Sequence, residues 1–160
     1  MSELTITDLE VDDGLALQAV LPAPIETVWD FLRDPGHHAQ IDGSDMIRAA
    51  AGTERIERVG QVFVMEMLWT DGTTRYRTEN HVTRYDIEHR LEWLVADEGK
   101  APQGWTWGWT LASAPDDSTV AVCCCDWSQT SEQTREDKGF PVVDRDRIEA
   151  TLRNLAETLG

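Results

Sequence analysis

Basic residues are scarce in this sequence, and long apolar runs are absent. The 160 residues include 14 Lys or Arg against 30 Asp or Glu, which gives a formal net charge of −16 at pH 7. Such a chain repels phosphate groups, so we expect it to bind neither nucleic acid nor an anionic membrane surface. No apolar run approaches the roughly 18 residues that span a membrane. The first residues also lack the basic and apolar stretches of a secretory signal.

Cysteine is nearly absent as well. The three cysteines, Cys123, Cys124 and Cys125, are contiguous. An odd, contiguous set is not a disulfide framework, and it lacks both the ligand spacing and the histidine partners of a zinc site. Free thiols without a secretory signal fit a reducing compartment. The sequence therefore predicts a cytoplasmic protein with no metal and no cofactor.

Internal repeats and low-complexity linkers are missing too. The length suits one domain, and a hydrophobic share of 41% is ordinary for a globular protein. We expect a single domain over residues 1–160, as a monomer or a homodimer.

The N-terminal part of the chain combines an extended segment with helical spacing. Residues 4–20 are typical of a strand. The apolar residues that follow recur at intervals of three and four, which predicts a helix. They are Ile25, Val28, Trp29 and Leu32. A second short helical turn is expected over His37–Ile41, with His37 and His38 at the surface.

The apolar period changes to two in the middle of the chain and returns to helical spacing at the end. From Met46 to about Trp127 the alternation predicts six consecutive antiparallel strands, with a hairpin at Asp71-Gly72. The last apolar residues predict a long helix over Pro141–Leu159. They are Ile148, Leu152, Leu155 and Leu159.

This order of elements predicts an internal cavity. The apolar face of a six-stranded meander must be covered, and a twisted sheet wraps around a single helix rather than lying flat on it. The arrangement leaves room for a largely apolar ligand cavity. The aromatic residues that alternate onto this face are Trp69, Tyr76, Trp93, Trp107 and Trp109. Their rings either fill the core or stack on a flat polycyclic ligand, so we treat them as candidate ligand-binding residues.

Two polar residues are candidates for catalysis. Asn80 falls on the inner face, where its amide either ties strands together or orients a ligand carbonyl. Asp144 lies one turn before Ile148, where it either caps the last helix or acts as an acid or base at the cavity mouth. Asp126 and Thr151 are weaker candidates for contact with a ligand.

Six local strings follow one another in a recognisable order. They are Ala23-Pro24-Ile25-Glu26-Thr27-Val28-Trp29, Ile41-Asp42-Gly43-Ser44, Arg58-Val59-Gly60-Gln61, Asp126-Trp127-Ser128, Gly139-Phe140-Pro141 and Ile148-Glu149-Ala150-Thr151-Leu152. With them the whole chain resembles the START-like helix-grip superfamily (SRPBCC), and within it the polyketide cyclase/dehydrase-like branch. The resemblance implies an α+β fold. A seven-stranded, curved antiparallel sheet would wrap around a long C-terminal helix, with two short N-terminal helices and a ligand cavity.

The resemblance leaves several functions open, since members of the superfamily bind lipids, cyclise or dehydrate polyketides, or act as carriers and co-chaperones. The first hypothesis is a cyclase or dehydratase, a lyase-type enzyme, that holds a hydrophobic, aromatic or polyketide-derived molecule and uses Asn80 and Asp144. The aromatase/cyclases have an arginine on an inner strand, whereas Arg75 and Arg77 have outward parity here. The alternative is therefore a non-catalytic binding or carrier protein for a hydrophobic lipid or metabolite. A co-chaperone-like module ranks last, because the sequence shows no apolar surface patch.

Overall fold

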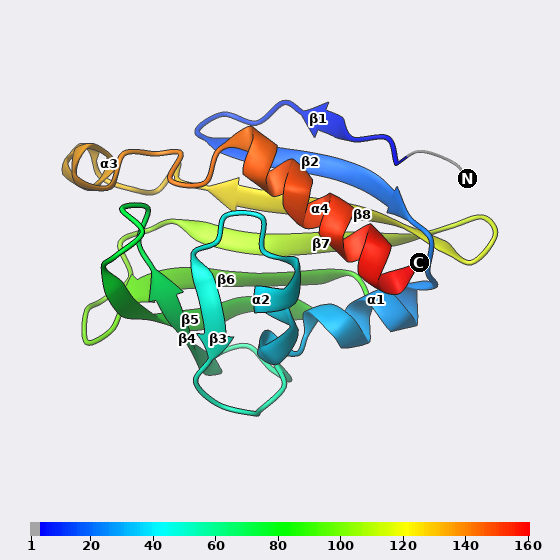
Figure 1. Ribbon diagram of the computed structural model, residues 1–160, viewed down its shortest axis with the longest axis horizontal. Helices are drawn as coiled ribbons and strands as arrows, with labels where there is room; N and C mark the ends of the chain where they lie inside the picture. Colours follow the sequence, from blue (N-terminus) through cyan, green and yellow to red (C-terminus); the bar gives the residue numbers. More distant parts are fainter. Residues whose placement is uncertain (1–3) are drawn as a thin grey trace.

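The computed structural model describes residues 4–160 and contains one antiparallel sheet of eight strands in the order β1-β2-β8-β7-β6-β5-β4-β3 (Figure 1). The strands are β1 (Thr7–Leu9), β2 (Gly14–Leu21), β3 (Ile47–Ala50), β4 (Val62–Leu68), β5 (Arg75–Asp86), β6 (Arg90–Asp97), β7 (Thr106–Ala114) and β8 (Ser118–Asp126). Every neighbouring pair is antiparallel, so six consecutive strands, β3 to β8, follow one another as hairpins, as the alternation predicts.

Helical segments complete the fold, and most of them lie against the sheet. They are α1 (Ile25–Leu32), the 3-10 turn η1 (Pro35–His37), α2 (His38–Ile41), α3 (Glu132–Lys138) and α4 (Arg145–Leu159). In Figure 1, α4 crosses in front of the strands at the β2–β8 side of the sheet, and α2 lies beside it, while α1 packs against β7 and β8. Ile148, Leu152 and Leu155 of α4 are buried, so the apolar stripe of the helix faces the core. Within residues 4–160, no helix combines the length and apolar character needed to cross a membrane.

The predicted α+β helix-grip fold is confirmed, with eight strands in place of the seven expected. The additional strand comes from the segment that we expected as a single strand before Val20. This segment turns back on itself, and β1 pairs with β2 so that Thr7 lies opposite Gln18. Asp13 in the turn has a φ of 52°, a left-handed conformation that Asp adopts more readily than most residues.

Two features of the C-terminal region differ from the sequence prediction. Helix α4 begins at Arg145, not at Pro141, because the Asp144 carboxylate accepts a hydrogen bond of 3.1 Å from the backbone N–H of Arg147 and caps the helix. Helix α3 was not expected. Its N-terminus is capped by the Ser131 hydroxyl, and it ends at Gly139, whose φ of 75° suits a residue without a Cβ atom.

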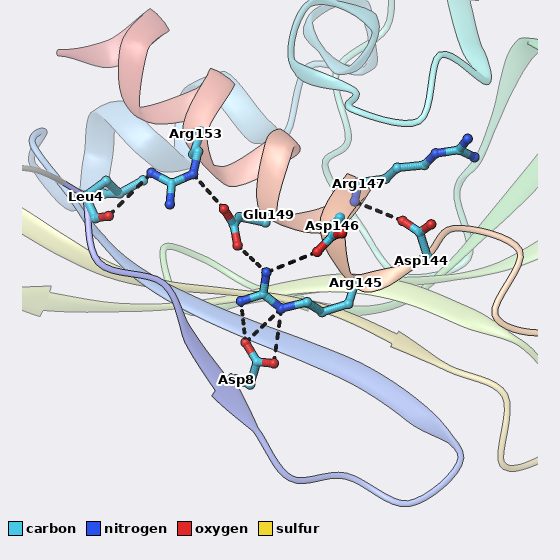
Figure 2. Close-up of polar contacts among 8 residues, drawn as sticks. All are labelled: Leu4, Asp8, Asp144, Arg145, Asp146, Arg147, Glu149 and Arg153. Carbon is cyan, nitrogen blue, oxygen red and sulfur yellow. Dashed lines mark hydrogen bonds and ion pairs between the residues drawn. The ribbon is translucent and has the colours of Figure 1, made fainter.

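An ion-pair network ties the edge strand β1 to α4 (Figure 2). The guanidinium of Arg145 donates to both carboxylate oxygens of Asp8 at 2.8–3.1 Å and also pairs with Glu149. Glu149 in turn accepts from Arg153 at 2.8 Å, and Arg153 donates to the backbone oxygen of Leu4. The hydrogen bond from Arg145 lowers the pKa of Asp8 below its usual value. The network fixes the N-terminal hairpin against the helix that the sheet encloses.

The loop after α2 packs tightly against α4. The backbone N–H of Gly43 donates to Thr151 Oγ1 at 2.9 Å, and Asn154 Nδ2 donates to the Ile41 oxygen at 3.1 Å. A Cβ atom at Gly43 would lie 2.4 Å from the backbone oxygen of Arg147, so no larger residue fits without moving the helix. These contacts hold α2 in a fixed position over the inner face of the sheet.

Candidate functional site

A pocket of about 150 Å³ lies between the inner face of the sheet and the helices. Strands β4 to β8 form its wall. Helix α2 with the loop after it, α4, and the segment that joins α3 to α4 close it on the other sides. Each wall residue comes from one parity of its strand, so the pocket follows from the same alternation that builds the sheet.

Aromatic side chains dominate the pocket wall. Trp93 of β6 lies opposite Trp107 of β7 in the strand register, and Trp109 follows two residues later on the same face. Phe63 of β4 meets Trp93 edge to face, with 5.3 Å between ring centroids and an interplanar angle of 74°. The five aromatic residues predicted from the sequence, Trp69, Tyr76, Trp93, Trp107 and Trp109, all line the pocket.

His38 brings a buried imidazole to this wall. Only 6% of the residue is exposed, and its ring stacks on Trp93 with centroids 5.6 Å apart and an angle of 20°. Its Nε2 lies 2.7 Å from the backbone oxygen of Leu32. A carbonyl oxygen only accepts, so Nε2 carries the proton and Nδ1 has a free lone pair. Burial lowers the pKa of His38, which keeps the ring neutral at pH 7. The expectation that this histidine lies at the surface is therefore wrong.

Asn80 of β5 has a fixed orientation in the pocket. Its Nδ2 donates to the Phe63 backbone oxygen and to Thr78 Oγ1, each at 3.1 Å. Asn80 is 3% exposed and lines the pocket. The amide thus ties β5 to β4, and both of its donor positions point to protein acceptors. The Asn80 side chain can therefore offer a ligand only its acceptor oxygen, Oδ1.

Other polar groups in the pocket are engaged in holding the fold. Thr151 Oγ1 accepts from Gly43 and donates to the Arg147 backbone oxygen at 3.2 Å, so its methyl group is what it can offer a ligand. The Asp42 carboxylate accepts from the backbone N–H groups of Ser44 and Ile47 and from the Ser44 hydroxyl. These bonds shape the loop that carries α2 into β3.

Lys138, the last residue of α3, forms a polar closure at one end of the pocket. Its Nζ lies 2.8 Å from Asp97 Oδ2 at the end of β6, and both side chains are roughly a quarter exposed. The same ammonium lies 5.5 Å from the Trp69 ring centroid and 5.6 Å from that of Trp105. Phe140, just beyond α3, stacks against Trp127. The α3–α4 segment is therefore held over the pocket by one ion pair and by aromatic contacts.

The remaining titratable groups of the wall are neutral at pH 7. Burial raises the pKa of the Cys123 and Cys125 thiols well above the usual value, so neither supplies a thiolate nucleophile. Burial likewise raises the pKa of the Tyr76 phenol. The inner part of the pocket is apolar, with a few neutral hydrogen-bonding groups.

Two of the predicted site residues do not line the pocket. The Asp144 carboxylate is the exposed N-cap of α4, bonded to Arg147 N. Asp126, at the end of β8, accepts from the backbone and hydroxyl of Ser128 in a tight turn. The other predicted residues are brought together in one place, since Asn80 and Thr151 join the five aromatic residues there.

Sequence reasoning missed His38 and Lys138 as pocket residues. The helical spacing of α1 does not predict the position of His38, which lies six residues beyond Leu32. The hydrogen bond from His38 Nε2 to the Leu32 backbone oxygen forms only in the folded chain. For Lys138 a weak signal was present. It is one of only two lysines, and it directly precedes Gly139, the residue that ends a helix.

A curved antiparallel sheet that encloses a long C-terminal helix, with a pocket between them, defines the START-like helix-grip class, so this sequence-based prediction is confirmed. Within that class, the family model described as "Activator of Hsp90 ATPase homolog 1-like protein" matches residues 22–160. The chain belongs to this family. No curated protein sequence matches it.

Solved structures with the same fold come from several bacteria. Protein Ms6760 from Mycobacterium smegmatis has a TM-score of 0.69 at 22% identity, over 97% of this chain and 98% of that one. A protein from Arthrobacter aurescens has the same TM-score at 18% identity, over 96% and 90% of the two chains. DynU16, described as a putative protein in the dynemicin biosynthetic locus, has a TM-score of 0.54 at 21% identity. That match covers 91% of this chain and 48% of DynU16.

Proposed function

We propose that this protein binds a small aromatic molecule in the pocket between the sheet and α4. The observation that carries the proposal is that three indole rings on one face of β6 and β7, those of Trp93, Trp107 and Trp109, border the same pocket. Aromatic rings attract other rings in offset or edge-to-face arrangements. Burial of an apolar guest against them removes its surface from water, which favours binding.

The volume of the pocket favours a ligand of one ring. Sites for drug-sized molecules usually enclose about 300–1,000 Å³, whereas an apolar cavity of about 150 Å³ accepts a benzene-sized guest. The pocket, at about 150 Å³, matches the second case. A polycyclic or long polyketide-derived ligand would require the α3–α4 segment to move outward.

A second candidate function is cyclisation or dehydration of a bound intermediate. DynU16, which shares the fold, is described as belonging to a biosynthetic locus, and confinement in a pocket promotes intramolecular reactions. For such chemistry the base on the pocket wall is the neutral His38 and not Asp144, which caps α4 outside. Simple binding is the better supported function, because the donor positions of Asn80 are already used and no carboxylate in the pocket is free of backbone or ion-pair partners among residues 4–160.

A pair of variants on β6 tests the proposed binding. Val95 lines the pocket, whereas its neighbour Leu94 lies on the opposite face of the strand. Val95→Phe should fill the pocket and weaken toluene binding about tenfold or more, the equivalent of about 1.4 kcal/mol. Leu94→Phe should leave the affinity within about threefold, because its side chain points to the face of the sheet opposite the pocket.

Toluene titration followed by NMR and by tryptophan fluorescence measures the affinity, and thermal denaturation confirms that both variants fold. Equal affinity in the two variants would place the toluene site elsewhere. An absence of saturable binding to the unsubstituted protein would rule out the proposed function altogether.

A further inference from the structure

We propose that the ligand carries a hydrogen-bond donor, and that its class is a small phenol whose hydroxyl group bonds to His38 Nδ1, with Asn80 Oδ1 as a second acceptor on the same wall. The inference rests on the proposed function, since it names the chemistry that the same pocket selects. It goes beyond that function by distinguishing a hydroxylated ring from a plain hydrocarbon and from a carbonyl compound.

The first step is the direction in which Asn80 presents its amide. Three protein oxygens lie within hydrogen-bond distance of Nδ2: Phe63 O and Thr78 Oγ1 at 3.1 Å, and Thr78 O at 3.5 Å. Phe63 O and Thr78 O are carbonyl oxygens that only accept, so the group that faces them is the NH₂ group of the amide. No donor among residues 4–160 bonds Oδ1. Asn80 therefore offers the pocket an acceptor and cannot orient a ligand carbonyl.

The second step is the tautomer of His38. The bond from Nε2 to the Leu32 oxygen, at 2.7 Å, places the ring proton on Nε2. Nδ1 is then an acceptor, and no donor among the described residues 4–160 bonds it. The ring itself is held by its stack on Trp93 and by the edge of Phe63, whose centroid is 5.9 Å away. The lone pair of Nδ1 is thus held in one orientation.

The third step is that the two residues are almost completely buried in one wall, yet neither acceptor is a fully buried atom without a partner, so each can be reached from the pocket. His38 and Asn80 are 6% and 3% exposed and both line the pocket. Phe63 contacts both residues, through its ring and through its backbone oxygen. An acceptor on an apolar pocket wall is satisfied only by water or by a guest that donates a hydrogen bond. A guest that brings an O–H group supplies that donor, whereas a guest that brings only a carbonyl or a nitrile places a third acceptor beside two others.

The indole side chains of the pocket wall favour a ligand in which the hydroxyl group is attached to an aromatic ring. Trp93 is the residue on which His38 stacks, and its neighbours Trp107 and Trp109 continue the aromatic wall. A hydroxyl group attached directly to an aromatic ring can reach the acceptors while the ring remains against the indoles. The neutral pocket wall also favours the uncharged phenol, because an anion would be desolvated there without a cation. Lys138, the cation at the pocket end, is already paired with Asp97.

Three probes of similar size test the proposal. Phenol donates a hydrogen bond, benzonitrile only accepts one, and toluene neither donates nor accepts. With the unsubstituted protein we expect phenol to bind about fivefold more tightly than toluene, the value of one net hydrogen bond, and benzonitrile to bind most weakly. His38→Phe keeps an aromatic ring against Trp93 and removes Nδ1. It should lower phenol affinity about tenfold relative to toluene affinity, because only phenol loses a hydrogen bond.

A direct measurement on the unsubstituted protein covers the case in which His38→Phe does not fold. The ¹⁵N chemical shift of His38 Nδ1 should move upfield when phenol is added and stay in place when toluene is added. The inference is overturned if toluene binds but phenol does not bind more tightly, or if benzonitrile binds best. It is also overturned if phenol binds without moving the ¹⁵N chemical shift of His38 Nδ1. Failure of all three probes to bind is a different result, since it overturns the proposed function itself.

Discussion

At the scale of single residues, His38 has the least expected environment in the molecule. Burial is the largest cause of its lowered pKa, and the charged or titratable groups that also act on the ring are Asp34, His37 and Asp42. In the unfolded chain its pKa returns to about 6.5. Between the lowered pKa and about 6.5, the unfolded state therefore binds more protons than the folded state. The free energy of unfolding must then fall as the pH is lowered through this window.

This gives a prediction for stability against pH. Between pH 6.5 and 5, the protein should lose up to about 1.4 kcal/mol of unfolding free energy per pH unit from His38. The urea midpoint measures this loss. His38→Phe should show a flatter profile from a lower starting value, because Leu32 O loses its donor. His89→Phe, at an exposed position, is the matched control and should keep the slope. A slope that survives in His38→Phe would assign the pH dependence to other groups.

Residue-level prediction from the sequence succeeds where one strict period decides the outcome. Trp93, Trp107 and Trp109 reach the pocket because strand parity leaves each side chain only two directions. The outward placement of Glu66 and Arg77, which pair at 3.3 Å on the outer face, follows from the same rule. His38 escapes it because a four-residue helix has no periodic pattern. Its burial depends on Leu32, Phe63 and Trp93, which come from three different elements.

At the scale of elements, the boundaries of helices depend on caps more than on apolar spacing. The sequence EQTREDK of α3 has no apolar stripe, so periodicity could not find it. Its cap residues, Ser131 and Gly139, were the available signals. In α4 the apolar stripe was found, but the start was set four residues too early, because proline is favoured at the first helical position, whereas the residue that caps the helix is Asp144.

The role of Asp144 leads to a prediction about α4. Asp144→Ala removes the acceptor for Arg147 N and should lower the free energy of unfolding by about 0.5–2 kcal/mol. Asp144→Asn should retain most of the stability, because Asn caps about as well as Asp. In both variants the affinity for toluene should stay within about threefold, because the residue lies outside the pocket. Urea denaturation and the same titration measure these quantities. Loss of ligand binding in a folded Asp144→Asn protein would return Asp144 to the binding site.

At the scale of the whole molecule, net charge and ion pairing act in opposite directions. The chain carries −16 charges, so like charges repel one another in the compact state. The ion pairs of the described residues lie at the surface, where single pairs contribute at most about 1 kcal/mol. The network of Arg145 is the largest of them and joins only Asp8, Asp146, Glu149 and, through Glu149, Arg153. Repulsion among the unpaired carboxylates should therefore dominate.

Sodium chloride should consequently stabilise this protein. Salt shortens the screening length from about 30 Å at 0.01 M to a few ångströms near 1 M, which weakens repulsion spread over the whole surface. We expect the urea midpoint to rise steadily between 10 mM and 0.5 M NaCl. Urea is the required denaturant, because guanidinium is itself a salt, and chloride is preferable to sulfate, which strengthens apolar burial by exclusion from the surface.

Arg145→Gln removes the favourable pairs and makes the net charge more negative by one, so its midpoint should start lower and rise more steeply with salt. The opposite result is a urea midpoint that falls with salt in the unsubstituted protein and no longer falls in Arg145→Gln. It would show that the ion-pair network between β1 and α4 contributes more to stability than the charge repulsion of the whole molecule removes.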